Sequence, residues 1–249
     1  MSEASVAASR YSEGEFRVGR VLSRTFSVLS RNLLPFCVVT AIAYLPSLAI
    51  LAEQGQPMQT GRALLLIGLG AVLGIVLNAL SEAIVLFGAF EDMRGRPVNL
   101  MASARVGLNR LLPVVGVALL VGLFTGLAAI LLLIPAFIVM TMLFVAMPAC
   151  IVEQLSPMPS LRRSRELTKG HRWAIFGLWF LVAIIVAIGS KLAGLIGSLI
   201  GGVGLSLLFS LIWGALAGAF NAIMVVVAYH DLRVAKEGVD TDKIASVFD

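Results

Sequence analysis

Long apolar blocks alternate with short polar segments along this chain of 249 residues. The first block, Leu33–Ala52, has no charged residue and as a helix would be about 30 Å long, which matches the thickness of the hydrocarbon core of a bilayer. The pattern predicts an all-α integral membrane bundle of six transmembrane helices, with cytoplasmic amphipathic helices between them. The expected spans are residues 33–52, 63–90, 111–132, 135–151, 173–190 and 207–229.

Two segments need interpretation before six spans can be counted. Leu111–Val152 is a run of 42 residues without a charge, and as one helix it would be about twice as long as a bilayer is thick. We therefore expect it to fold back near residues 133–135, and Pro148 to bend the span that follows. The glycine-rich segment 191–206 is compatible with a helical extension, a re-entrant hairpin or a loop.

The remaining residues are predicted to form tails. Residues 1–14 are rich in Ser, Ala and Glu and are expected to be disordered. Residues 15–233 form the expected membrane domain, and residues 234–249 form a cytoplasmic C-terminal tail.

Composition supports lipid as the solvent for much of the chain. It is 59% hydrophobic and 13% charged, whereas soluble domains carry about 25% charged residues. Basic residues also predict the orientation, because Lys and Arg remain on the cytoplasmic side of a membrane. With both termini inside, 17 of the 19 Lys and Arg lie inside, all except Arg62 and Lys191. We expect a multi-pass protein of the bacterial inner (plasma) membrane.

Basic residues also gather just before the apolar blocks. Arg17, Arg20, Arg24 and Arg31 follow one stripe of a helix, which is typical of a helix lying at an anionic membrane surface or docked on the protein's own bundle, and both can hold. The expected partners are anionic lipid headgroups, with a homo-oligomer or a membrane partner protein, and no nucleic acid. The candidate anionic-lipid contacts are Arg17, Arg20, Arg24, Arg31, Arg105, Arg110, Arg162, Arg163, Arg165, Lys169 and Arg172.

The same plan recurs three times, as a basic helix followed by a two-span hairpin that returns to the cytoplasm. A basic residue stands before each hairpin and an acid follows it; these pairs are Arg31 and Asp92, Arg110 and Glu153, and Arg172 and Asp231. Because each unit has an even number of spans, the copies would be a parallel threefold repeat. The alternative is that any six-span protein with an inside N-terminus shows basic residues in these places.

Glu82 is the one acid inside an apolar span. A charge there costs about 2.5–3.5 kcal/mol on insertion scales, so it should face a cavity or a basic partner. Asn78 is four residues earlier and shares its helix face. The functional interpretation is a site for a proton, a cation or a substrate headgroup, and the structural one is a salt bridge to Arg24 or Arg31. Asn221, in the last span, is interpreted more readily as an interhelical hydrogen bond than as a ligand.

Small residues spaced four apart allow helices to approach closely. The candidate helix-packing glycines are Gly70, Gly74, Gly122, Gly126, Gly197, Gly201, Gly214 and Gly218. No catalytic, cofactor-binding or metal-ligating pattern is found. The only histidines, His171 and His230, stand at the ends of apolar blocks, and His230–Asp231 is better interpreted as a polar end to a span than as a catalytic dyad.

Two segments carry a family resemblance. Ser160–Trp173 (SLRRSRELTKGHRW) and Val227–Gly238 (VAYHDLRVAKEG) resemble segments of the bacterial glycerophosphoryl diester phosphodiesterase membrane-domain family. The resemblance implies a six-helix integral membrane domain. Because the catalytic domain found in some relatives is missing here, it implies no phosphodiesterase activity.

The leading functional hypothesis is a non-enzymatic inner-membrane protein that associates with anionic lipids or partner subunits, as an oligomer. The alternative is a transporter or channel whose path is lined by Glu82 and Asn78. An enzyme acting on lipid is disfavoured, because no paired acid and base are visible.

Overall fold

The computed structural model describes residues 16–52 and 60–237, and every regular element in these ranges is a helix. The predicted N-terminal tail, the end of the C-terminal tail and most of the polar turn after the first span lie outside the described residues. The helices are α2 (Val18–Arg31), α3 (Leu33–Ala52), α4 (Thr60–Met93), α5 (Leu100–Asn109), α6 (Leu111–Leu131), α7 (Leu133–Leu143), α8 (Ala146–Val152), α9 (Pro157–Thr168) and α10 (Arg172–Glu237).

The predicted all-α class is confirmed, and several helices are long and apolar enough to cross a membrane. Among the described residues four stretches qualify: Gly68–Met93, Leu111–Ile130, Ile134–Val152 and Arg172–Glu237. A fifth qualifies if α2 and α3, which meet at 93°, count together.

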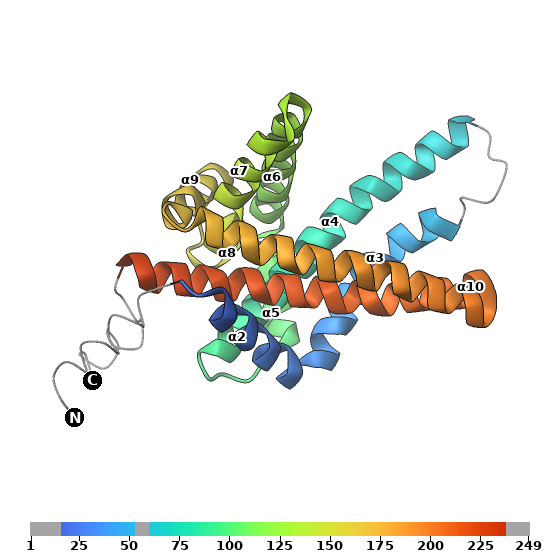
Figure 1. Ribbon diagram of the computed structural model, residues 1–249, viewed down its shortest axis with the longest axis horizontal. Coiled ribbons are helices and arrows are strands. Elements are labelled where there is room, and N and C mark those ends of the chain that lie inside the picture. Colours follow the sequence, from blue (N-terminus) through green and yellow to red (C-terminus); the bar gives the residue numbers. More distant parts are fainter. Residues whose placement is uncertain (1–15, 53–59, 238–249) are drawn as a thin grey trace.

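Helix α10 is a hairpin of two helical halves. The chain reverses at Gly201 and Gly202, whose backbone angles are not helical, and the orange and red halves run along each other (Figure 1). Trp213 of the second half donates from its Nε1 to the carbonyl of Val186 in the first half, at 3.1 Å. Of the three alternatives for residues 191–206, the structure has the helical extension.

The structure places two further breaks in the chain. The α6–α7 turn is at Leu132, whose backbone is extended, next to the expected 133–135. The break between α7 and α8 lies at Phe144 and Val145, one turn before Pro148. Proline has no N–H to donate and its ring crowds the carbonyl four residues earlier, here that of Phe144. Within this break, the N–H of Val145 donates to Ser164 Oγ of α9, at 3.2 Å.

Three hairpins therefore extend from one region of the molecule: α3 with α4, α6 with α7, and the two halves of α10. In Figure 1 they point in different directions, while α2, α5, α8 and α9 lie around their common base. The core is concentrated there, and its fully buried side chains come from all three hairpins and from α2 and α9. Examples are Val28, Phe36, Leu86, Leu167 and Tyr229. The short helix α2 is thus docked on the bundle through its apolar face, with Val21 and Val28 buried.

Candidate functional site

Glu82 lies between two cavities inside the helical bundle. The first cavity, of about 310 Å³, lies between α3, α4 and both halves of α10. The second, of about 360 Å³, lies between α4, α6, α7, α8 and α10. Glu82, Trp179 and Asn221 line both, so these three side chains form the wall that separates the cavities. Both volumes are in the range of small-molecule sites.

The two cavities differ in chemistry. The first is lined by several polar side chains, namely Thr40, Tyr44, Asn78, Ser81, Glu82 and Asn221. Apart from the three shared residues, the second is lined by apolar groups such as Val117, Met140 and Phe144. The helical spacing predicted from the sequence thus brings Asn78 and Glu82 to one cavity, and the fold adds Asn221 from a segment far along the chain.

Glu82 forms no ion pair with any residue in the described ranges, so the expected salt bridge to Arg24 or Arg31 is not formed. Arg31 instead bonds to Asp92, with 2.6 Å between Nη2 and Oδ2. Arg24 lies 3.6 Å from Asp231. The reason is distance along α4, because Asp92 is ten residues beyond Glu82, which is about 15 Å of helix rise. The arginines of α2 reach the base of the hairpins and not the level of Glu82.

The amides are not used to join helices. Asn78 Nδ2 donates to the carbonyl of Gly74 in its own helix, at 2.8 Å. Asn221 is exposed to the cavities and makes no side-chain hydrogen bond within the described part of the chain. The interhelical bond expected of Asn221 is made by another residue, since Thr40 Oγ1 of α3 donates to the carbonyl of Ala215 in α10, at 2.7 Å.

The wall of the first cavity offers one carboxylate, two amides, three hydroxyls and the ring of Trp179. Carboxylates and the faces of aromatic rings both attract cations. Within the described ranges no group of three or more His, Cys, Asp and Glu lies together where it could hold a metal ion. The arrangement therefore suits a cation held by one charge and by neutral oxygen and ring contacts.

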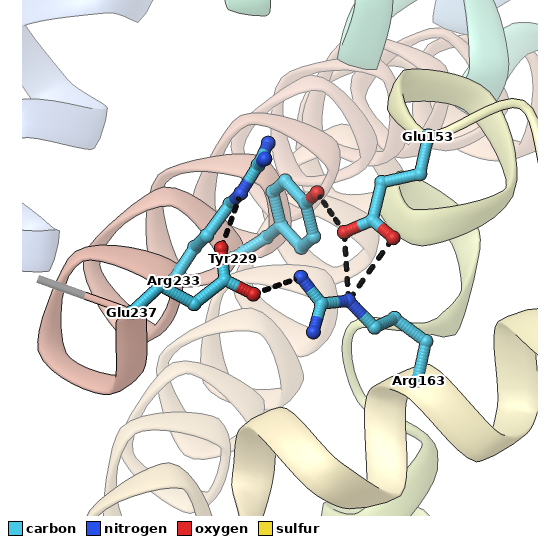
Figure 2. Close-up of polar contacts among 5 residues, drawn as sticks. All are labelled: Glu153, Arg163, Tyr229, Arg233 and Glu237. Atoms are coloured by element: carbon cyan, nitrogen blue, oxygen red, sulfur yellow. Dashed lines mark hydrogen bonds and ion pairs between the residues drawn. The ribbon is translucent and has the colours of Figure 1, made fainter. Parts of the chain in front are cut away.

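A second polar cluster lies at the base of the hairpins (Figure 2). Arg163 Nε donates to both carboxylate oxygens of Glu153, at 2.8 and 3.0 Å, and the hydroxyl of Tyr229 donates to Glu153 at 2.7 Å. Arg163 also bonds to Glu237, which accepts from Arg233 at 2.9 Å. The cluster therefore ties α9 and the end of α8 to the last turns of α10.

This basal cluster shifts the pKa values of its charged groups. Burial acts to lower the pKa of Arg163, but the hydrogen bonds to Glu153 and Glu237 outweigh it and raise the pKa. Burial acts to raise the pKa of Glu237, but the hydrogen bonds from Arg163 and Arg233 outweigh it and lower the pKa. The sequence interpretation missed the cluster, because Arg163 was assigned to lipid. The two segments that carry the family resemblance contain arginines, and the sequence could have suggested that Glu153 and Glu237 pair with them.

The predicted lipid-contact residues divide into two kinds. Arg24, Arg31 and Arg163 bond to acids of the protein, and Arg110 donates to the backbone carbonyls of Gln154 and Leu155. Arg17 and Arg20 also have interactions of their own, and Arg162 lies 3.8 Å from Glu166 on the exposed face of α9. Among these predicted residues, the exposed ones without an ion pair in the described ranges are Arg105, Arg165 and Lys169.

At the end of the last apolar block, His230 and Asp231 lie against Arg24 of α2. His230 Nδ1 is 3.5 Å from Arg24 Nη1 and 3.6 Å from Asp231 Oδ1. Asp231 is buried, and it meets α2 through Arg24.

The candidate packing glycines also divide. A Cβ on Gly214 or Gly218 would lie 3.2 Å from the ring of Tyr44, so these glycines allow α3 to approach α10. A Cβ on Gly197 would lie 2.5 Å from the backbone of Ser206, so Gly197 allows the two halves of α10 to meet. Gly74, Gly122 and Gly126 have open space beside them. The sequence interpretation missed Gly189, where a Cβ would collide with Trp213.

Comparison of the chain with protein-family models, with curated proteins and with solved structures finds no match.

Proposed function

We propose that this is an inner-membrane protein of six spans in three parallel helix-plus-hairpin units, with both termini in the cytoplasm. The two halves of α10 supply two spans once the reversal at Gly201–Gly202 is counted, and α2, α5 and α9 each precede one hairpin. A shared contact supports the repeat, because Arg31 and Arg110 each bind the exit of the hairpin that they precede, at Asp92 and at Gln154–Leu155.

We propose that this protein binds a small cationic solute at Glu82 and moves it between the two cavities. The observation that carries the proposal is that Glu82 and Asn221 line both cavities while Glu82 has no ion-pair partner in the described ranges. An unpaired acid in an apolar bundle is costly, and such residues usually mark ion or substrate pathways. Transport therefore takes precedence over the lipid-associating role expected from the sequence, since several arginines assigned to lipid bind the protein itself.

Replacing Glu82 with Gln tests the proposal in two ways. In proteoliposomes loaded with the purified protein, uptake of labelled methylammonium and rubidium should fall at least about tenfold, because the one charge of the cavity wall is lost. The thermal unfolding midpoint in detergent should stay the same or rise, because Gln removes the cost of an unpaired carboxylate within an apolar bundle. Glu91→Gln, at the end of the same helix and outside both cavities, is the matched control.

The outcomes separate function from structure. Uptake unchanged in Glu82→Gln would overturn the transport proposal. A lower unfolding midpoint in Glu82→Gln, with Glu91→Gln unaffected, would show instead that Glu82 holds the fold together.

A further inference from the structure

A third hollow lies apart from the central cavities, between α7 and the start of α10. It is a groove of about 490 Å³. Its lining is apolar and aromatic except for Thr141 of α7 and Arg172 at the start of α10. The main lining residues are Ile134, Phe137, Ile138, Arg172, Trp173 and Phe176.

Ring contacts hold the walls of the groove. Phe137 of α7 meets Phe176 of α10 edge to face, with 5.3 Å between the ring centroids, and lies 6.0 Å from Trp179. The outer surfaces remain open, because Trp173 is 86% exposed and Ile134 is 72% exposed. The groove is thus a shaped, exposed apolar surface on a protein that we place in a bilayer. Lipid chains are the apolar molecules available to it there.

Arg172 supplies a charge to this groove. Its Nε is buried and has no hydrogen-bond partner, and no ion pair links Arg172 to a residue in the described ranges. A buried donor without an acceptor destabilises a protein. The guanidinium group is suited to phosphate, because its N–H groups can bind two oxygens at once.

The first two helix-plus-hairpin units show a contact that Arg172 of the third unit does not make. Arg31 and Arg110 hold the same place, directly before the apolar helices of their hairpins, and each is satisfied inside the protein. In the third unit Asp231, the acid that would match, lies 3.6 Å from Arg24 instead. Arg172 is therefore the one arginine of the three without a bond to the exit of its hairpin within the described residues, and it lines the groove.

We propose that this groove binds an anionic phospholipid, with its phosphate on Arg172 and an acyl chain along Ile134, Ile138 and Phe176. Charge complementarity selects the anionic headgroup, and the apolar walls select a chain over a free phosphate ion. Trp173 lies beside Arg172, and indole rings favour the level of the headgroups. The site is independent of Glu82, because the groove shares no lining residue with either central cavity.

Native mass spectrometry of the full chain in detergent, titrated with phosphatidylglycerol, tests the site. Arg172→Gln should raise the concentration needed for half-saturation about tenfold, since a hydrogen-bonded charge pair is lost. Ile138→Trp should lower lipid binding while keeping Arg172, because the larger side chain fills the groove. Arg165→Gln is the matched control, an exposed arginine on α9 that lines no cavity, and it should bind as the wild type does. Phosphatidylcholine should bind more weakly than phosphatidylglycerol in every variant that keeps Arg172.

Four results would overturn the proposal. Equal losses in Arg165→Gln and Arg172→Gln would indicate diffuse attraction to surface charge, and no loss in Arg172→Gln would remove the headgroup contact. Unchanged binding in Ile138→Trp would show that no acyl chain enters the groove. This variant also tests the proposal if Arg172→Gln fails to fold. Inorganic phosphate that displaces the lipid at equal concentration would indicate an anion site without a chain.

Discussion

At the scale of single residues, the acids of this protein differ in whether an arginine lies close to them. Asp92, Glu153 and Asp231, which follow the three hairpins, each lie within 4 Å of an arginine, namely Arg31, Arg163 and Arg24 respectively. Glu82, the one acid inside an apolar span, has no such partner among the residues that the structure describes. Stabilising pairs are thus placed at the base, where the core is also concentrated, and the unpaired charge is placed where the cavities are.

Glu237 makes the basal cluster sensitive to acid. Its pKa in the folded state lies below its ordinary value of 4.5, because the bonds from Arg163 and Arg233 outweigh the effect of burial. The stabilisation is therefore fully present above that value and is lost as the pH falls through the lowered pKa. We expect Glu237→Gln to unfold at a lower temperature than the wild type at pH 7, and this difference should shrink toward pH 3. Thermal unfolding in detergent across this pH range measures it.

The control for this experiment is Glu166→Gln. Glu166 is exposed and 3.8 Å from Arg162, so it should change the unfolding midpoint little at any pH, since exposed pairs contribute little. A difference between wild type and Glu237→Gln that stays constant down to pH 3 would contradict the role assigned to the carboxylate.

Part of the candidate site could be predicted from the sequence at this scale. Glu82 and Asn78 could be found, because a polar group in an apolar span is conspicuous and a spacing of four puts both on one face. Trp179, Thr40 and Tyr44 could not, because aromatic and hydroxyl side chains occur in apolar helices for many reasons and only the fold shows which of them meet Glu82. The salt bridge predicted between Glu82 and Arg24 or Arg31 was wrong, because the sequence does not show how far α2 lies from the level of Glu82.

At the scale of elements, the reversal of α10 uses a backbone conformation at Gly202 that favours glycine. Gly202 has φ of 68° and ψ of −152°, a region that side-chain-bearing residues avoid, while nothing lies within 4 Å of the place that a Cβ would occupy. Gly202→Ala should therefore destabilise the fold by about 1–3 kcal/mol through the backbone alone. Chemical or thermal unfolding in detergent measures this loss.

Gly204 provides the matched control, because it also has open space around it and has no positive φ. Gly204→Ala should leave stability unchanged or raise it slightly, since Ala favours helices. Equal effects of the two substitutions would show that the turn does not depend on the conformation of Gly202.

Element boundaries could be predicted where composition changes sharply. The first span, 33–52, has the bounds of α3, and the α6–α7 turn lies one residue from the expected segment. The segment 191–206 could not be decided, because glycine and leucine suit a helix, a loop and a tight turn alike. The structure decides between these alternatives, because the backbone angles at Gly202 are ones that favour glycine and the chain reverses there.

At the scale of the whole molecule, the three hairpins share a base that is both the packed core and the site of nearly all ion pairs described above. The basic helices α2, α5 and α9 lie at that base, and the hairpins extend away from it (Figure 1). Most charges are therefore gathered at one end of every hairpin. The positive-inside rule therefore predicts that this end faces the cytoplasm, as proposed above.

This arrangement predicts which side of the membrane each end of a hairpin faces. A reporter fused after Asp249 should be active in the cytoplasm, as green fluorescent protein is, and inactive as alkaline phosphatase. In a background with Cys37 and Cys150 replaced by Ala, a cysteine in place of Gln56, in the polar turn after the first span, should react with an impermeant maleimide in intact spheroplasts. A cysteine in place of Arg96, after α4, should react only once the membrane is opened. The physical reason is that 17 of the 19 Lys and Arg lie on the side assigned to the base.

Labelling of Arg96→Cys from outside, or alkaline phosphatase activity after Asp249, would invert the orientation. The basic face of α2 and Arg172 would then meet the outer leaflet instead of the inner one.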